Sequence, residues 1–86
     1  MKLNFITEAW FVNERTNGEW VRFAVRVGDQ VQYGTISDAA LAEIALKAGS
    51  ATEDAMNATL LRVVSTYARV NPAARVLAIG MPVIWE

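Results

Sequence analysis

The chain has 86 residues, of which 53% are hydrophobic and 20% charged, and its formal net charge is −1. This length supports one small core and excludes a multidomain enzyme, while the hydrophobic content excludes intrinsic disorder. The sequence contains no cysteine and no histidine, which excludes disulfides, thiolate metal sites and the commonest general base. We therefore expect a single α+β domain over residues 1–86 that is not an enzyme and has no metal, cofactor or small-molecule ligand.

Neither charge nor targeting signals suggest a membrane or nucleic-acid partner. A near-neutral chain produces no long-range field toward polyanions or anionic lipid. The first eight residues are interrupted by Asn, Thr and Glu, so they do not form the apolar region of a secretory signal. No apolar run approaches the ~18 residues of a membrane span. A cytoplasmic protein is the expectation.

Alternating apolar residues between Leu3 and Ile36 predict three β-strands. Asn17-Gly18 is a strong signal for a two-residue hairpin loop, and that loop pairs Trp10 with Val25. A one-residue slip of this register would move every apolar side chain to the other face of the sheet.

The second turn follows at Gly28-Asp29-Gln30. A two-residue turn would set Gln32 opposite Val25 in the core, whereas a three-residue loop sets Tyr33 there, so the pattern favours the longer loop. The expected product is a three-stranded antiparallel meander. Its predicted core face consists of Trp10, Val12, Val21, Phe23, Val25, Val27, Val31 and Tyr33.

Two helices are predicted after the strands. Ser37 as N-cap and Gly49 beyond the end predict a helix from Asp38 to Lys47. Ser50-Ala51-Thr52-Glu53 has the pattern of a capping box with Ser50 as N-cap, so a second helix begins at once and forms an αα-hairpin with the first. The apolar stripe expected to pack on the sheet comprises Met56, Leu60, Val63, Tyr67, Val70, Ala74 and Leu77.

Pro72 leaves the end of the second helix open, because it lacks an amide donor and its ring collides with the preceding turn. Either one kinked helix runs to Ile79, or the helix stops near Arg69 and Asn71-Pro72 starts a short third helix that ends at Gly80. The segment 81–85 then predicts a short strand at a sheet edge. The expected order is β-β-β-α-α-β.

Short matching segments along nearly the whole chain relate it to a known family. They are Trp10 before a turn, Val21-Arg22-Phe23, Ile36-Ser37 leading into Ala40-Leu41, Leu60-Leu61 and Ala73-Ala74-Arg75-Val76. In these segments the chain resembles the small bacterial domain-of-unknown-function family 1488. The resemblance implies an antiparallel sheet with helices packed on it, and it implies no activity, cofactor or catalytic residue. The chain departs from the family pattern at Val64, where an aromatic residue is commoner, and at Pro72.

The second face of the predicted sheet is the candidate functional surface. It combines large apolar groups, small residues and arginines, the composition of interface hot spots. The alternative is that the C-terminal segment, with Ile84 or Trp85, folds over this face. The candidate interaction residues are Phe11, Trp20, Arg22, Ala24, Arg26 and Ile36.

These patterns predict a non-catalytic protein-interaction or oligomerisation module, whose partner is another protein or a second copy of the chain. The alternative is an RNA- or DNA-binding accessory domain that uses Trp20, Arg22 and Arg26. The net acidic charge and the lack of a glycine-rich phosphate loop count against nucleic acid. The carboxylates fall at strand ends, loops and a helix start, where charge is expected without catalysis.

Overall fold

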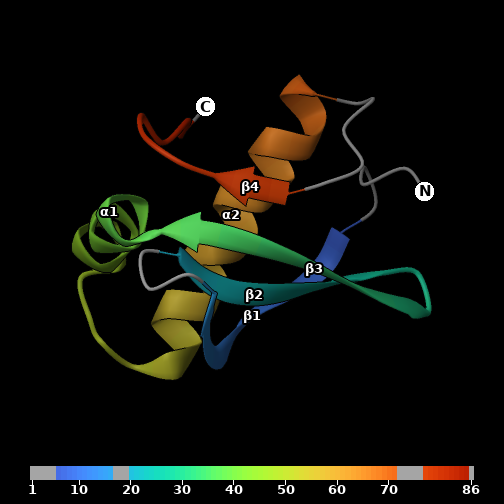
Figure 1. The fold of residues 1–86 in the computed structure, drawn as a ribbon, viewed down its shortest axis with the longest axis horizontal. Helices are drawn as coiled ribbons and strands as arrows, with labels where there is room; N and C mark the ends of the chain where they lie inside the picture. The colour runs from blue at the N-terminus through green and yellow to red at the C-terminus, as the bar shows by residue number, and fades with distance from the viewer. Residues whose placement is uncertain (1–5, 17–19, 72–76, 86) are drawn as a thin grey trace.

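The computed structural model describes residues 6–16, 20–71 and 77–85, which form a four-stranded sheet and two helices (Figure 1). The sheet has the order β1-β2-β3-β4, in which the first three strands are antiparallel and β4 is parallel to β3. This confirms the predicted α+β fold with a C-terminal strand. The elements are β1 (Ile6–Thr16), β2 (Trp20–Val27), β3 (Gln30–Ser37), α1 (Asp38–Ala48), α2 (Glu53–Val70) and β4 (Leu77–Ile79).

The hairpin between β2 and β3 closes with a two-residue turn, because Val27 pairs with Gln30. Gly28 has a φ of 64°, a left-handed conformation that glycine adopts without strain and that suits a tight hairpin. The expected three-residue loop is therefore wrong. Val25 therefore lies opposite Gln32, which is half-buried. The pairing of β3 with β4 begins at Gly34 and Leu77, so β4 does not flank β3 at Gln32.

The pairing of β1 with β2 is also one residue away from the prediction. Phe11 lies opposite Phe23, Ala9 lies opposite Val25, and Trp10 lies opposite Ala24. Residues paired directly across an antiparallel ladder point to the same face, so Ala9 and Phe11 face the core and Trp10 faces away from it.

The shift arises at the hairpin and at a bulge. Thr16 pairs with Trp20 and not with Glu19 as predicted, and the loop residues 17–19 lie outside the described residues. The register shifts again between Phe11 and Arg15, where four positions of β1 pass two positions of β2. Two inserted residues restore the original facing, so the change of face arises at the hairpin.

The first helix is capped as predicted. The Ser37 hydroxyl accepts a hydrogen bond from the Ala40 amide at 3.2 Å, and Gly49 ends α1 with a φ of 71°. The N-cap of α2 is Thr52, whose hydroxyl accepts from the Ala55 amide at 3.3 Å, so the predicted N-cap Ser50 is wrong. Ser50 instead accepts from the Thr52 amide at 3.2 Å and orders the turn before the helix.

The end of α2 confirms one part of the second alternative raised by Pro72, in which the helix stops near Arg69. The helix ends at Val70, and Leu77–Ile79 is the strand β4, so a helix that continues to Ile79 or ends at Gly80 is wrong for this segment. The start of the predicted third helix, at Pro72, lies outside the described residues. The C-terminal strand also lies earlier than the predicted 81–85, which is irregular.

One core lies between the inner face of the sheet and α2, which passes behind the sheet in Figure 1. Gly34 allows β3, β4 and the Phe23 ring to meet closely, because a Cβ there would lie 2.6 Å from both Phe23 Cζ and the Leu77 carbonyl oxygen. The largest fully buried side chains are Phe23, Val25, Ile36, Ile44, Leu60, Val64 and Leu77.

Candidate functional site

The face of the sheet that points away from α2, called here the outer face, is defined by the register of the strands. Its central row runs from Trp10 on β1 through Ala24 on β2 to Tyr33 on β3. Ala24 is fully buried between these aromatic neighbours, while Tyr33 is 54% exposed. The described residues of the outer face are Glu8, Trp10, Trp20, Arg22, Ala24, Arg26, Val31, Tyr33, Thr35 and Ser37.

Two arginines lie across the aromatic rings of this face. Arg22 Cζ is 4.6 Å from the centroid of the Tyr33 ring, and Arg26 Cζ is 5.6 Å from the centroid of the Trp10 ring. Each such contact contributes about 0.5–1 kcal/mol at an exposed site. Arg26 Nε also donates to Glu8 Oε1 at 3.1 Å. The result is a surface of rings and guanidinium groups ordered by their mutual contacts.

The structure places four of the six predicted site residues on this face. Trp20, Arg22, Ala24 and Arg26 alternate along β2 and point outward together.

The other two predicted site residues belong to the core. Ile36 pairs with Val21 and is fully buried, and Phe11 pairs with Phe23 and packs against the core cluster. Their placement on the second face is wrong because both hairpin registers differ by one residue from the predicted ones.

Sequence reasoning missed Trp10, Val31 and Tyr33, which it assigned to the core. The signal for β3 was present in Gly28-Asp29, because a two-residue turn at this glycine places Tyr33 beside Ala24. No comparable signal was available for Trp10, whose orientation depends on the pairing of Thr16 with Trp20 at the hairpin.

The C-terminal segment does not cover the central row with Trp85 as the alternative proposed. Trp85 and Val83 pack against the core cluster, and Lys47 Nζ of α1 lies 5.5 Å from the Trp85 ring centroid. The segment approaches the outer face near Gly80, where a Cβ would lie 3.9 Å from Trp20 Cη2.

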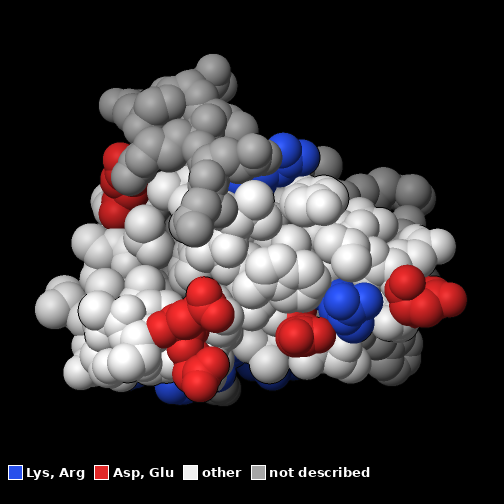
Figure 2. Space-filling model, turned by 90° about the horizontal axis from the view of Figure 1, so that it is seen from below, with Lys and Arg blue, Asp and Glu red and all other residues white. Residues whose placement is uncertain are grey.

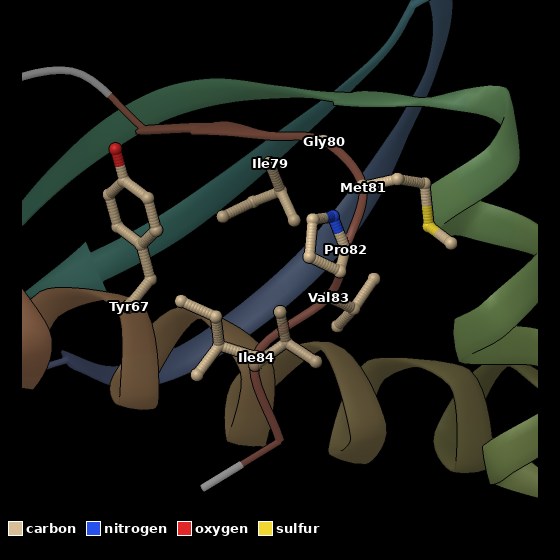
Figure 3. A pocket seen from close by; sticks show the side chains of 8 residues that line it. Tyr67, Ile79, Gly80, Met81, Pro82, Val83 and Ile84 are labelled. Atoms are coloured by element: carbon tan, nitrogen blue, oxygen red, sulfur yellow. The ribbon is translucent and has the colours of Figure 1, made fainter.

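A hollow lies between α2 and the C-terminal segment (Figure 3). Its volume is about 210 Å³, and the Tyr67 ring forms one wall. None of the lining side chains carries a charge, and the Tyr67 hydroxyl is the hydrogen-bonding side-chain group among them. It is lined by Val63, Tyr67, Ile79, Gly80, Met81, Pro82, Val83 and Ile84.

The charged groups of the described residues are spread over the surface. Figure 2 shows acidic and basic side chains scattered over a largely uncharged surface on the side of the molecule seen there. Among the described residues, no cluster of acidic side chains has the geometry to hold a metal ion. In the same part of the chain, neither helix is both long and apolar enough to cross a lipid bilayer.

Comparisons with known proteins identify no relative. No protein-family model, curated protein or solved structure matches the chain. The resemblance to family 1488 stays a prediction.

Proposed function

We propose that this chain is a non-catalytic interaction module and that the outer face of its sheet is the contact surface. The observation that carries the proposal is the row of Trp10, Ala24 and Tyr33 with an arginine stacked on each ring. Tryptophan, tyrosine and arginine are the side chains most enriched in interface hot spots. Their rings are held by cross-strand neighbours, so little side-chain entropy remains to be lost on binding.

The same contacts favour a protein partner over a nucleic acid. Sheet-based RNA binders stack bases on exposed aromatic faces and neutralise phosphates with unpaired cations. Here the ring faces of Trp10 and Tyr33 are engaged by guanidinium groups, and Arg26 is already bonded to Glu8. A nucleic acid would have to displace these contacts before it could bind.

Site-specific photocrosslinking in the native cell tests this proposal. A photoreactive phenylalanine analogue replaces Val31, which is 38% exposed on the outer face, and in a matched control it replaces Leu46, which is 79% exposed on α1. We expect crosslinked protein species from position 31 and only background from position 46. Background at both positions, or the same species from both, would contradict the proposal.

A further inference from the structure

We infer that the hollow between α2 and the C-terminal segment is a binding site for a small neutral aromatic compound, a single ring with a short substituent. The inference goes beyond the proposed function and does not depend on it, because the residues that line the hollow are different from those of the outer face. Three features of the hollow support it: its shape, the chemistry of its walls and its volume.

The hollow has a closed end and an open mouth. Val63 of α2 and Ile79 of β4 form the closed end, since they are only 2% and 4% exposed. Ile84, which is 42% exposed, lies at the mouth. Figure 3 shows the side chains of Ile79, Pro82 and Ile84 around the space beside the Tyr67 ring. A ligand can therefore enter from solvent and contact protein on several sides.

The walls of the hollow favour a neutral ligand. The described side chains that line it carry no charge, so an ionised ligand would lose hydration there without gaining an ion pair. Water is also held weakly, because a buried water makes about three hydrogen bonds and the lining side chains offer it the Tyr67 hydroxyl. The replacement of such water by an apolar group favours binding.

The Tyr67 ring favours an aromatic ligand over an aliphatic one. The ring stands at one side of the hollow, and Ile79 and Ile84 border the same space (Figure 3). A second ring placed there gains an offset or edge-to-face contact with Tyr67 in addition to the apolar area that it buries. An aliphatic ligand of the same size would gain the buried area alone.

The volume of the hollow sets the size of the ligand. The hollow measures about 210 Å³. An apolar cavity of about 150 Å³ holds benzene, so the larger volume accommodates a ring with a short substituent, about eight non-hydrogen atoms in all. At the binding efficiency typical of very small ligands, such a compound has a dissociation constant of about 0.1–1 mM.

Titration of the full chain with 4-methylphenol up to about 10 mM, followed by methyl NMR spectra, tests the site. A bound aromatic ring shifts the resonances of the methyl groups that it contacts. Ile79 and Ile84 line the hollow, and the control is Ile44, which is fully buried in the core cluster and does not line it. We expect saturable shifts of Ile79 and Ile84 with one common midpoint, and shifts about fivefold smaller at Ile44.

A charged probe and three variants test the chemistry of the walls. Benzoate, which has a similar size but is ionised at pH 7, should bind about tenfold or more weakly than 4-methylphenol. Tyr67→Leu keeps an apolar wall but removes the ring, and it should weaken 4-methylphenol binding about fivefold. Ile84→Ala opens the exposed mouth and should also weaken binding, which gives a second test if Tyr67→Leu does not fold. Leu46→Ala on α1 should bind like the native chain, and circular dichroism establishes that each variant is folded.

Three results would overturn the site. The first is the absence of saturable shifts up to about 10 mM, or equal shifts at Ile44 and at the two lining isoleucines. The second is an unchanged affinity for 4-methylphenol in both folded wall variants, Tyr67→Leu and Ile84→Ala. The third is benzoate binding as tight as that of 4-methylphenol, which would contradict a neutral ligand.

Discussion

The close approach at Gly34 provides the sharpest test of the packing between β3 and β4. In Gly34→Ala, the new methyl group would lie 2.6 Å from Phe23 Cζ and from the Leu77 carbonyl oxygen, and 2.7 Å from Leu77 Cβ. Ordinary contacts between carbon atoms are about 3.5–4.0 Å, so the neighbours must move by roughly 1 Å. Neither can do so easily, because Phe23 is fully buried and the Leu77 oxygen belongs to the backbone of β4.

The expected loss of stability follows from two opposing effects. Overpacking a close-packed core costs about 1–3 kcal/mol, whereas replacing glycine by alanine recovers about 0.4–1 kcal/mol by restricting the unfolded chain. We expect the free energy of unfolding to fall by about 1.3 kcal/mol, the difference between the midpoints of these two ranges. A domain of this size has about 4–13 kcal/mol in total, and the melting temperature should fall by about 5–10 °C.

Gly80→Ala is the matched control. The added Cβ at Gly80 would meet only Trp20 Cη2 at 3.9 Å, an ordinary van der Waals contact. We expect its stability to stay within about 1 kcal/mol of the native value. Urea unfolding followed by circular dichroism measures both variants, with an unchanged m-value as the sign that the unfolded states are comparable. If Gly34→Ala is as stable as Gly80→Ala, the packing of Phe23 and β4 around Gly34 is wrong.

Four further substitutions test the capping, the core and the hairpin by the same unfolding measurement. Thr52→Ala should lower the free energy of unfolding by about 0.5–2 kcal/mol because it removes the N-cap of α2, and Ser50→Ala should lower it by less. A larger loss for Ser50→Ala than for Thr52→Ala would instead indicate that Ser50 is the N-cap. Leu60→Ala should cost about 2–5 kcal/mol because the side chain is fully buried between α2 and the sheet, and a cost under 1 kcal/mol would place it outside the core. Gly28→Ala should cost about 1 kcal/mol because alanine is strained at a φ of 64°, and a stabilised variant would argue for the longer β2–β3 loop.

The spacing of apolar residues and the helix-capping residues predicted the main strands and helices and their order. The alternation in β2 correctly placed Val21, Phe23, Val25 and Val27 on the core face, and Ser37 correctly marked the start of α1. These features are local, because a strand's alternation and a cap's hydrogen bond depend on residues within a few positions of one another.

The registers could not be predicted because they depend on pairing between strands. The sequence favours Tyr33 in the core on hydrophobicity, but the turn at Gly28 brings Gln32 opposite Val25 instead. A buried Tyr33 would have satisfied the pattern better, yet the core beside Phe23 and Gly34 is completed by Leu77 of β4. The apolar residue that completes this core thus lies more than forty positions away along the chain.

The candidate surface was predicted in part for the same reason. Its β2 residues were correct because β2 alternates regularly, whereas Phe11 and Ile36 moved to the core with the shifted neighbouring strands. The aromatic rings that define the surface, Trp10 and Tyr33, are the residues that replaced them on the outer face.

The central claim is that the outer face is open in the free chain and covered by a partner in the cell. Hydroxyl-radical footprinting tests it directly, because the chain has two tyrosines, of which Tyr33 is on the outer face and Tyr67 lines the hollow beside α2. We expect the oxidation of Tyr33 relative to Tyr67 to be high in dilute purified protein and several-fold lower in the native cell. An equal ratio in the two conditions would contradict the claim.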